Sequence, residues 1–162
     1  KLAGEEAVRQ AGDNHLILRT AWVYGARGHN FLRTMLRLGA EREALNVVAD
    51  QTGTPTPAYL IADVTARLLG MTAPARGTLH LTASGGTTWH GFAEAIMQGA
   101  ATRGLLERVP RISPITSAEF PTRARRPAYS RMDVSALEGV LGTPLPHWQQ
   151  GLDRVLDQIA KA

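Results

Sequence analysis

The residues best suited to chemistry follow an apolar run near the start of the chain. The run at 16–18 leads into the segment 19–24, which carries Trp22 and ends at a glycine-containing loop over 25–28. In open α/β sheets, ligand sites form where strands stop at such loops. An indole in this place can cover a sugar ring while its N–H donates a hydrogen bond. A core strand with a tryptophan filling a gap is the alternative, and this segment alone leaves both interpretations open.

A second candidate is the dense basic run from Arg123 to Arg131, which prolines interrupt. The arginine fork matches phosphate oxygens with two parallel hydrogen bonds. Pro127 stiffens the loop and so reduces the entropy lost on binding. Arg125 and Arg126 are therefore predicted to bind an anionic group, and Arg126, in the Arg-Pro pair, is the preferred of the two. A solvated basic surface is the alternative.

Three weaker candidates are Asn30, Phe31 and Gln51. Asn30 is also a plausible N-cap for the helix that follows it. Gln51 lies in a loop over 50–56 that is dense in glycine, proline and threonine. A side-chain amide there can bind a sugar hydroxyl or the edge of a base.

Hydrophobic periodicity indicates alternating helices and strands around these loops. Helices are expected over 2–11, after the caps Asn30 and Thr88, from Pro57, after Asp133 and from Trp148. Strands are expected near 15–20, 45–49, 78–82 and 112–115. The loops near 50–56, 83–88 and 121–131 then stand out as functional.

Composition bounds the class of protein. The chain has 162 residues, 44% hydrophobic and 20% charged, which suits one globular domain with its own core. It has no cysteine, so disulfides and thiolate metal sites are excluded, and its five histidines are scattered, so no metal site is expected. No apolar run approaches the ~18 residues of a membrane span, and a cytoplasmic location is the default expectation.

The net charge is +4 and the pI is about 10.1. The charges are mostly dispersed, and lysine occurs only at Lys1 and Lys161. A nucleic-acid partner is therefore not expected, since such proteins gather their cations on one face.

Four segments, read together in order and spacing, resemble the dTDP-4-dehydrorhamnose reductases, a family of the extended short-chain dehydrogenase/reductase superfamily. They are Lys1–Glu5, Arg19–Gly25, Asp50–Thr56 and Arg125–Asp133. The resemblance runs from Lys1 to the C-terminal helix but covers only the second half of such an enzyme. The sequence contains no Gly-x-x-Gly-x-x-Gly loop for the dinucleotide.

The resemblance implies an α/β fold: the C-terminal part of a Rossmann-type extended short-chain reductase. Residues 1–29 would be the residual end of the Rossmann domain. Residues 30–162 would be mainly the substrate-binding lobe, with some helices packing back on the Rossmann sheet. The implied partners are a missing N-terminal Rossmann half, a dTDP-sugar substrate and, as one arrangement, a second copy in a homodimer.

The resemblance also implies roles for the candidates. Lys1 would hold the nicotinamide ribose of NADPH or NADH and lower the pKa of a tyrosine expected four residues upstream. Trp22 would contact the deoxysugar, and Arg125 and Arg126 the pyrophosphate. The expected activity is reduction of a dTDP-4-keto-6-deoxyhexose in dTDP-rhamnose synthesis, and the chain alone is expected to be inactive.

Some relatives bind magnesium at a dimer interface through glutamates, and the position matching one of these ligands is Tyr59 here. Tyrosine is a poor ligand for a hard cation, so a magnesium-bridged dimer is not expected. Two other functions stay open. One is a non-catalytic regulatory subunit of the same fold, and the other is a different sugar-nucleotide reductase or epimerase.

Overall fold

Helices and short strands alternate along most of the chain in the computed structural model, which describes residues 1–122, 124 and 126–162. In chain order the elements are α1 (Leu2–Ala11), β1 (Leu16–Arg19), β2 (Val23–Tyr24), α2 (Phe31–Glu41), β3 (Ala44–Val48), β4 (Thr52–Gly53), β5 (Thr56–Pro57), α3 (Ala58–Leu69), β6 (Gly77–His80), β7 (Thr87–Thr88), α4 (Trp89–Thr102), β8 (Arg111–Ile115), α5 (Ser135–Leu141) and α6 (Trp148–Ala160). Over the residues described, no helix combines the length and apolar character that crossing a membrane requires.

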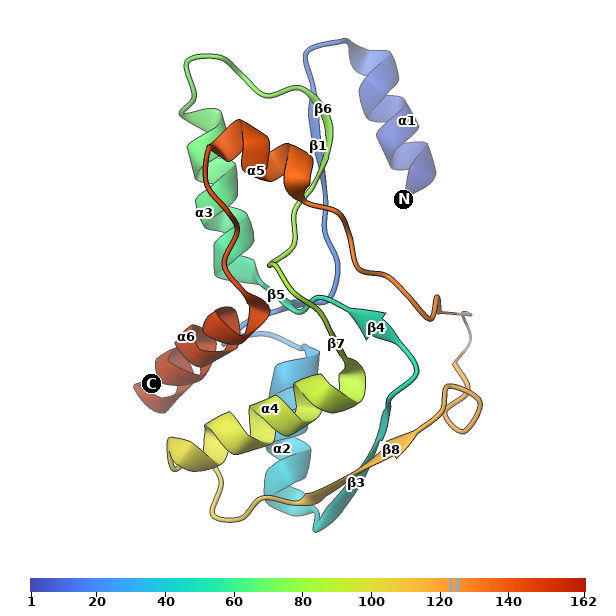
Figure 1. Cartoon of the computed structure of the whole chain (residues 1–162), viewed down its shortest axis with the longest axis vertical. Coiled ribbons are helices and arrows are strands. Elements are labelled where there is room, and N and C mark those ends of the chain that lie inside the picture. Colours follow the sequence, from blue (N-terminus) through green and yellow to red (C-terminus); the bar gives the residue numbers. More distant parts are fainter. Residues whose placement is uncertain (123, 125) are drawn as a thin grey trace.

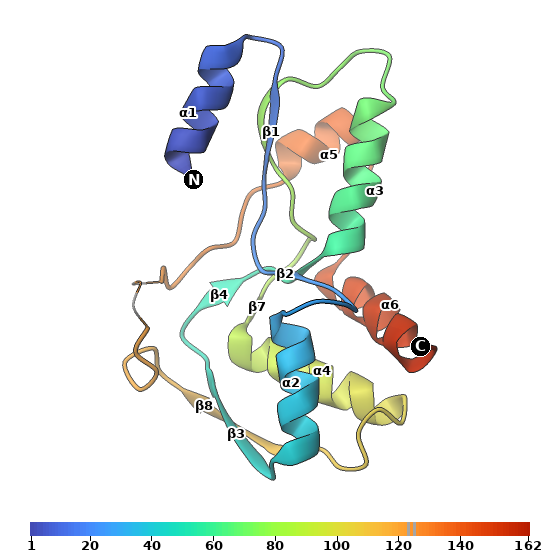
Figure 2. The same cartoon turned by 180° about the vertical axis from the view of Figure 1, so that it is seen from behind.

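Strands far apart in the sequence pair two by two. β1 pairs with β6 in parallel, with Leu18 opposite Leu79, and β3 pairs with β8 in parallel, with Asn46 opposite Ser113. β2 and β5 form a short parallel pair, and β4 and β7 an antiparallel one. Figures 1 and 2 show the β1–β6 pair with α1, α3 and α5 at one end of the molecule, and the β3–β8 pair with α2 and α4 at the other.

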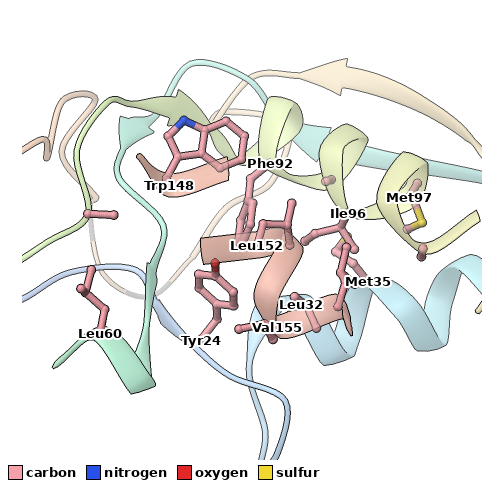
Figure 3. Packing of buried hydrophobic residues seen from close by; sticks show 14 of the residues in the cluster. Tyr24, Leu32, Met35, Leu60, Phe92, Ile96, Met97, Trp148, Leu152 and Val155 are labelled. Carbon is pink, nitrogen blue, oxygen red and sulfur yellow. The ribbon is translucent and has the colours of Figure 1, made fainter. Parts of the chain in front are cut away.

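The helix α4 lies at the end of the molecule that holds the β3–β8 pair. It packs against α2, α6 and that pair. Phe92, Ile96 and Met97, the side chains expected to face the core, are fully buried (Figure 3). Tyr24 also belongs to this core, where it packs edge-on against Phe92. Gly39 of α2 lets the two helices approach closely, because a Cβ there would lie 2.7 Å from the sulfur of Met97.

Local capping signals set most helix starts. Asn30 caps α2 by accepting a hydrogen bond from the Arg33 amide, and Thr88 caps α4 by accepting one from the Gly91 amide, as expected. The expected cap at Asp133 is wrong by one residue, since Val134 is the N-cap of α5. The Asp133 carboxylate still accepts a hydrogen bond from the Ser135 amide, so it organises the turn that precedes the helix.

The β1–β6 pairing brings part of the second predicted domain beside the first. Residues 77–80 run alongside the strand that belongs to the 1–29 segment. The expectation that helices of 30–162 pack back on a Rossmann-type sheet stays a prediction. The division at residues 29 and 30 itself stays a prediction.

Helix α1 lies at the margin of the structure and is attached mainly by polar contacts. It has no buried residue, and Leu2 and Val8 are 64% and 42% exposed. The Glu5 carboxylate accepts two hydrogen bonds from the Arg19 guanidinium of β1, at 2.8 and 2.7 Å. Arg9 reinforces the same carboxylate and also reaches Thr78 on β6. The guanidinium of Arg19, and with it Arg9, lowers the pKa of Glu5 to about 2.

This pKa predicts how the attachment of α1 depends on pH. Because the folded-state pKa lies below the ordinary 4.5, the stabilisation is fully present above pH 4.5 and is lost as the pH falls toward 2. We therefore expect Glu5→Gln to lower the unfolding temperature near neutral pH, and the difference from wild type to shrink as the medium is acidified. Thermal melts followed by helical circular dichroism measure it. Glu6→Gln, on the exposed neighbouring residue, is the control, and an equal effect of both variants would contradict the assignment.

Candidate functional site

A cavity of about 870 Å³ lies between α2, the β3–β8 pair and the segment that follows β8. This volume is in the range of pockets that hold small molecules. Its lining combines apolar and aromatic side chains with eight polar or charged ones and consists of Phe31, Thr34, Met35, Leu38, Arg42, Ala44, Leu45, Asn46, Val47, Val48, Gln51, Trp89, Arg111, Ile115, Glu119, Phe120, Thr122 and Arg126.

Three of the residues singled out from the sequence meet in this lining. Phe31, Gln51 and Arg126 come from the start of α2, the loop after β3 and the basic run, which lie far apart in the chain. Arg125 lies outside the described residues.

The charges around the cavity favour an anion. Arg42, Arg111 and Arg126 carry three positive charges into the lining, against one negative charge from Glu119. The Thr116 backbone amide donates to the Glu119 carboxylate, as does the Thr116 hydroxyl, and these hydrogen bonds lower the pKa of Glu119. Glu119 is therefore occupied by its own turn, and a ligand would meet mainly guanidinium groups.

One wall of the cavity is tied together by a small polar cluster. The Ser117 hydroxyl donates to the Asp50 carboxylate at 2.6 Å, and the Ser117 amide donates to the same group. These hydrogen bonds lower the pKa of Asp50. The Gln51 side-chain amide donates to the Ser117 hydroxyl at 2.8 Å. Gln51 thus lines the cavity while its N–H group holds the loop after β3 to the segment after β8.

Trp22 lies beside this cavity without lining it. Its indole stacks on that of Trp89, with ring centroids 3.6 Å apart and planes 5° apart. Trp89 itself is part of the lining. Trp22 has φ of 51°, in the left-handed region, which costs a non-glycine residue about 1–2 kcal/mol. The Trp22 side chain is thus half-buried, adopts a costly backbone conformation and stacks on a residue of the cavity lining.

The glycine at position 53 makes room for this indole. A Cβ on Gly53 would overlap the Trp22 ring. The loop dense in glycine and threonine is therefore shaped around Trp22. One face of the indole is covered by Trp89, so a ligand can meet Trp22 only on the surface that remains.

The side chain of Asn30 is engaged in local hydrogen bonds. It caps α2 with its oxygen and donates from its nitrogen to carbonyl groups of the 25–28 loop, the nearest that of Gly25 at 3.0 Å. Tyr24, two residues after Trp22, is buried in the core, and burial raises the pKa of its hydroxyl.

Lys1 stands apart from the cavity, at the N-terminus of α1. The Glu5–Arg19 ion pair nevertheless relates it to Trp22. Glu5 lies one helical turn after Lys1, and Arg19 ends the strand that leads to Trp22. This ion pair thus links the helix that follows Lys1 to the strand that precedes Trp22.

Sequence reasoning missed Trp89 and the cavity arginines outside the basic run, Arg42 and Arg111. One signal was available for Trp89: it is a large aromatic residue directly after a helix cap, and it follows the loop near 83–88 that was expected to be functional. Nothing local distinguishes Arg42 or Arg111 from other surface arginines, because the β3–β8 pairing is what brings them together.

Tyr59, the position that the resemblance aligned with a metal ligand, packs against an arginine. The guanidinium of Arg154 lies 4.0 Å from the centre of the Tyr59 ring. Within the described residues, no group of three or more histidine, cysteine, aspartate or glutamate side chains could hold a metal ion.

The overlap at position 53 makes a testable prediction. Gly53→Ala should force the Trp22 indole away from its present position and lower the free energy of unfolding by about 1–3 kcal/mol, the usual cost of overpacking. Chemical denaturation followed by tryptophan fluorescence measures both effects. Gly139→Ala in α5, where the space around the new methyl group is open, is the matched control and should be neutral or stabilising. Equal behaviour of the two variants would show that Gly53 does not constrain the indole.

Comparison with known proteins finds relatives that share one name. The dTDP-4-dehydrorhamnose reductase of Burkholderia thailandensis is 46% identical over 160 residues, which cover 92% of this chain and 53% of the relative. The dTDP-4-dehydrorhamnose reductase of Escherichia coli (strain K12) is 41% identical over 162 residues, covering 98% and 54%. The crystal structure of dTDP-4-dehydrorhamnose reductase from Bacillus anthracis in complex with NADP matches with a TM-score of 0.87 at 34% identity, covering 98% of this chain and 53% of that one.

The chain spans about half the length of the curated relatives that it matches. The predicted α/β fold class, the C-terminal part of a Rossmann-type extended short-chain reductase, is confirmed by these likenesses. The family model described as the RmlD substrate binding domain matches residues 1–161. The chain belongs to the RmlD substrate binding domain family.

Proposed function

We propose that this chain is the substrate-binding part of an NADPH-dependent reductase of a dTDP-4-keto-6-deoxyhexose, acting in dTDP-rhamnose synthesis. The observation that carries the proposal is the cationic, aromatic cavity beside the stacked Trp22, in a chain of this family. The sugar assignment follows the relatives, which are named dTDP-4-dehydrorhamnose reductases. The coenzyme assignment follows the Bacillus anthracis relative, whose structure contains NADP.

The cavity is proposed to hold the nucleotide of the dTDP-sugar. Phe31 and Trp89 offer aromatic surface to a base, and Gln51 offers the oxygen of its side-chain amide. Arg126 is proposed to bind the pyrophosphate, with Arg42 and Arg111 adding positive charge. Arg125 is retained as a second phosphate ligand on sequence grounds alone.

The sugar is proposed to lie against the surface of Trp22 that Trp89 leaves open. This places it near the end of β1, where open α/β sheets bind their ligands. Asn30 acts indirectly in this proposal, because its amide shapes the 25–28 loop next to Trp22.

A dinucleotide-binding half is proposed to cover the first part of the chain. The exposed Leu2 and Val8 of α1 need a packing partner, since helices gain most of their stability from burying an apolar face. The β1–β6 pair also needs further strands, because parallel sheets are normally buried and two strands alone are marginal. Residues 1–29 and 30–162 keep their proposed division, and a cytoplasmic location and a homodimer remain expectations.

The chain's own chemistry would then centre on Lys1. Its ammonium group is proposed to hold the coenzyme ribose and to favour the phenolate of an upstream tyrosine, which exchanges a proton with the sugar oxygen. The bound coenzyme supplies the hydride. The Glu5–Arg19 pair holds the helix of Lys1 against the strand that leads to Trp22.

Binding of dTDP by the chain itself tests the nucleotide cavity. A guanidinium facing a pyrophosphate gains about 1.5–3 kcal/mol from charge-assisted hydrogen bonds, and lysine recovers only part of it. We expect Arg126→Lys to weaken dTDP binding about tenfold, with an unchanged melting temperature, because the residue is on an exposed loop. Isothermal titration calorimetry gives both affinities. Arg37→Lys, on α2 but outside the lining, is the control, and a parallel loss in both variants would remove Arg126 from the site.

The reaction is tested by NADPH oxidation with dTDP-4-dehydrorhamnose. We expect turnover of about 1 per second or faster when the chain is joined to a dinucleotide-binding half, and no turnover by the chain alone. Reduction of other sugar nucleotides at equal rates would favour the broader reductase or epimerase assignment. Tight dTDP-sugar binding without turnover in the joined protein would favour the regulatory subunit.

A further inference from the structure

The two stacked tryptophans, Trp22 and Trp89, are held in place by different contacts. The backbone of Trp22 is fixed, since its carbonyl accepts a hydrogen bond from the Thr56 amide and the next residues pair with β5. Its indole, in contrast, is half-buried and rests on Trp89. The backbone of Trp22 has a left-handed φ of 51°, and Gly53 borders the ring as well as Trp89 does.

Trp89 is held from the core. It is the first residue of α4, whose start is capped by the Thr88 hydroxyl at 3.0 Å from the Gly91 amide. The Phe31 ring packs against it with centroids 4.7 Å apart, and Phe31 in turn stacks on the fully buried Phe92. Trp89 therefore cannot shift without disturbing α4, whereas the Trp22 indole rests on the Trp89 ring.

The two rings also face different parts of the site. Trp89 lines the cavity proposed for the nucleotide, and Trp22 does not. The indole of Trp89 thus forms part of the cavity wall and also supports the Trp22 indole, against which the sugar is proposed to lie.

We infer that Trp89 is a positioning residue, which fixes the plane of the Trp22 indole and thereby the orientation of the sugar relative to the reacting groups. The inference rests on the proposed function for its sugar. Misplacing a substrate by a fraction of its size slows the reacting step far more than it weakens binding, because the reacting atoms must meet in a narrow range of geometries. Loss of the stack should therefore lower kcat more than it raises KM.

The test uses the protein in which this chain is joined to the dinucleotide-binding half. Trp89→Leu keeps an apolar wall but removes the ring. KM for the dTDP-sugar should rise because the ring also faces the base, and we expect kcat at saturating sugar to fall by a larger factor, about tenfold or more. Trp89→Phe restores a ring and should recover kcat to within about threefold of wild type, since aromatic rings stack at similar separations. In a Trp22→Leu background, Trp89→Leu should add little further loss of kcat, because there is no indole left at position 22 to position.

A second readout does not depend on turnover. With 5-fluorotryptophan in place of the three tryptophans of the chain, the Trp22 fluorine resonance is assigned by Trp22→Phe. We expect it to shift and broaden in Trp89→Leu, as the ring samples several orientations. Tyr59→Leu is the matched control, because Tyr59 is also a half-buried ring in the first turn of a helix, far from the cavity lining.

The outcomes separate this inference from the proposed function. An unchanged Trp22 resonance in Trp89→Leu, or additive losses of kcat in the double variant, overturns the inference. Absent turnover in the wild-type joined protein counts against the proposed function, while the fluorine resonance still decides whether Trp89 holds Trp22. A purely structural role of Trp89 would lower the melting temperature and leave kcat per folded molecule unchanged, which also overturns the inference.

Discussion

The burial of α4 is the constraint on which the rest of the structure depends. Its core residues are sealed by α2 and α6 and by the β3–β8 pair, so the helix has one possible position and rotation. Close packing of this kind transmits displacement, since interiors have few voids to absorb it. Because Trp89 is the first residue of α4, the core determines where the aromatic wall of the cavity stands. The site is therefore an extension of the hydrophobic core, although its ligands are proposed to be polar.

The cationic side of the cavity is built on a different principle. Its arginines come from the ends of strands and from loops, and the β3–β8 pairing gathers them. The Asp50–Ser117 and Gln51–Ser117 hydrogen bonds hold the nearby turns. The Glu119 carboxylate accepts a hydrogen bond from Thr116. Carboxylates inside the wall thus organise the backbone and leave the guanidinium groups to a ligand. Rigid aromatic groups and adaptable cations are complementary, because one sets orientation and the other supplies long-range attraction.

Much of the fold follows from local signals. The caps at Asn30 and Thr88 and the apolar periodicity of α4 and α6 place those helices correctly, because capping and amphipathicity act within a few residues. The pairing of β1 with β6 and of β3 with β8 could not be read, since four- or five-residue strands carry no information about their partners. The same holds for the site. The types of Phe31, Gln51 and Arg126 were enough to predict them as site residues, whereas the Trp22–Trp89 stack could be seen only in the tertiary structure.

The arrangement separates the proposed binding cavity from the proposed catalytic lysine. The cavity lies within this chain, whereas Lys1 lies on a helix with no buried residue, at the margin of the structure. If the nucleotide binds in the cavity, its binding energy is available to orient a sugar that contributes few contacts of its own, which is how remote groups of a substrate accelerate a reaction.

That energy can orient the sugar only if the cavity and the surface under the sugar are rigidly connected. The stacked indoles connect the cavity to Trp22, and the Glu5–Arg19 ion pair connects β1, which precedes Trp22, to the helix that follows Lys1. The first is apolar and insensitive to salt, and the second is exposed and screened by it. The weaker of the two connections is therefore the one at the helix of Lys1, where a covering dinucleotide-binding half would exclude water and strengthen it.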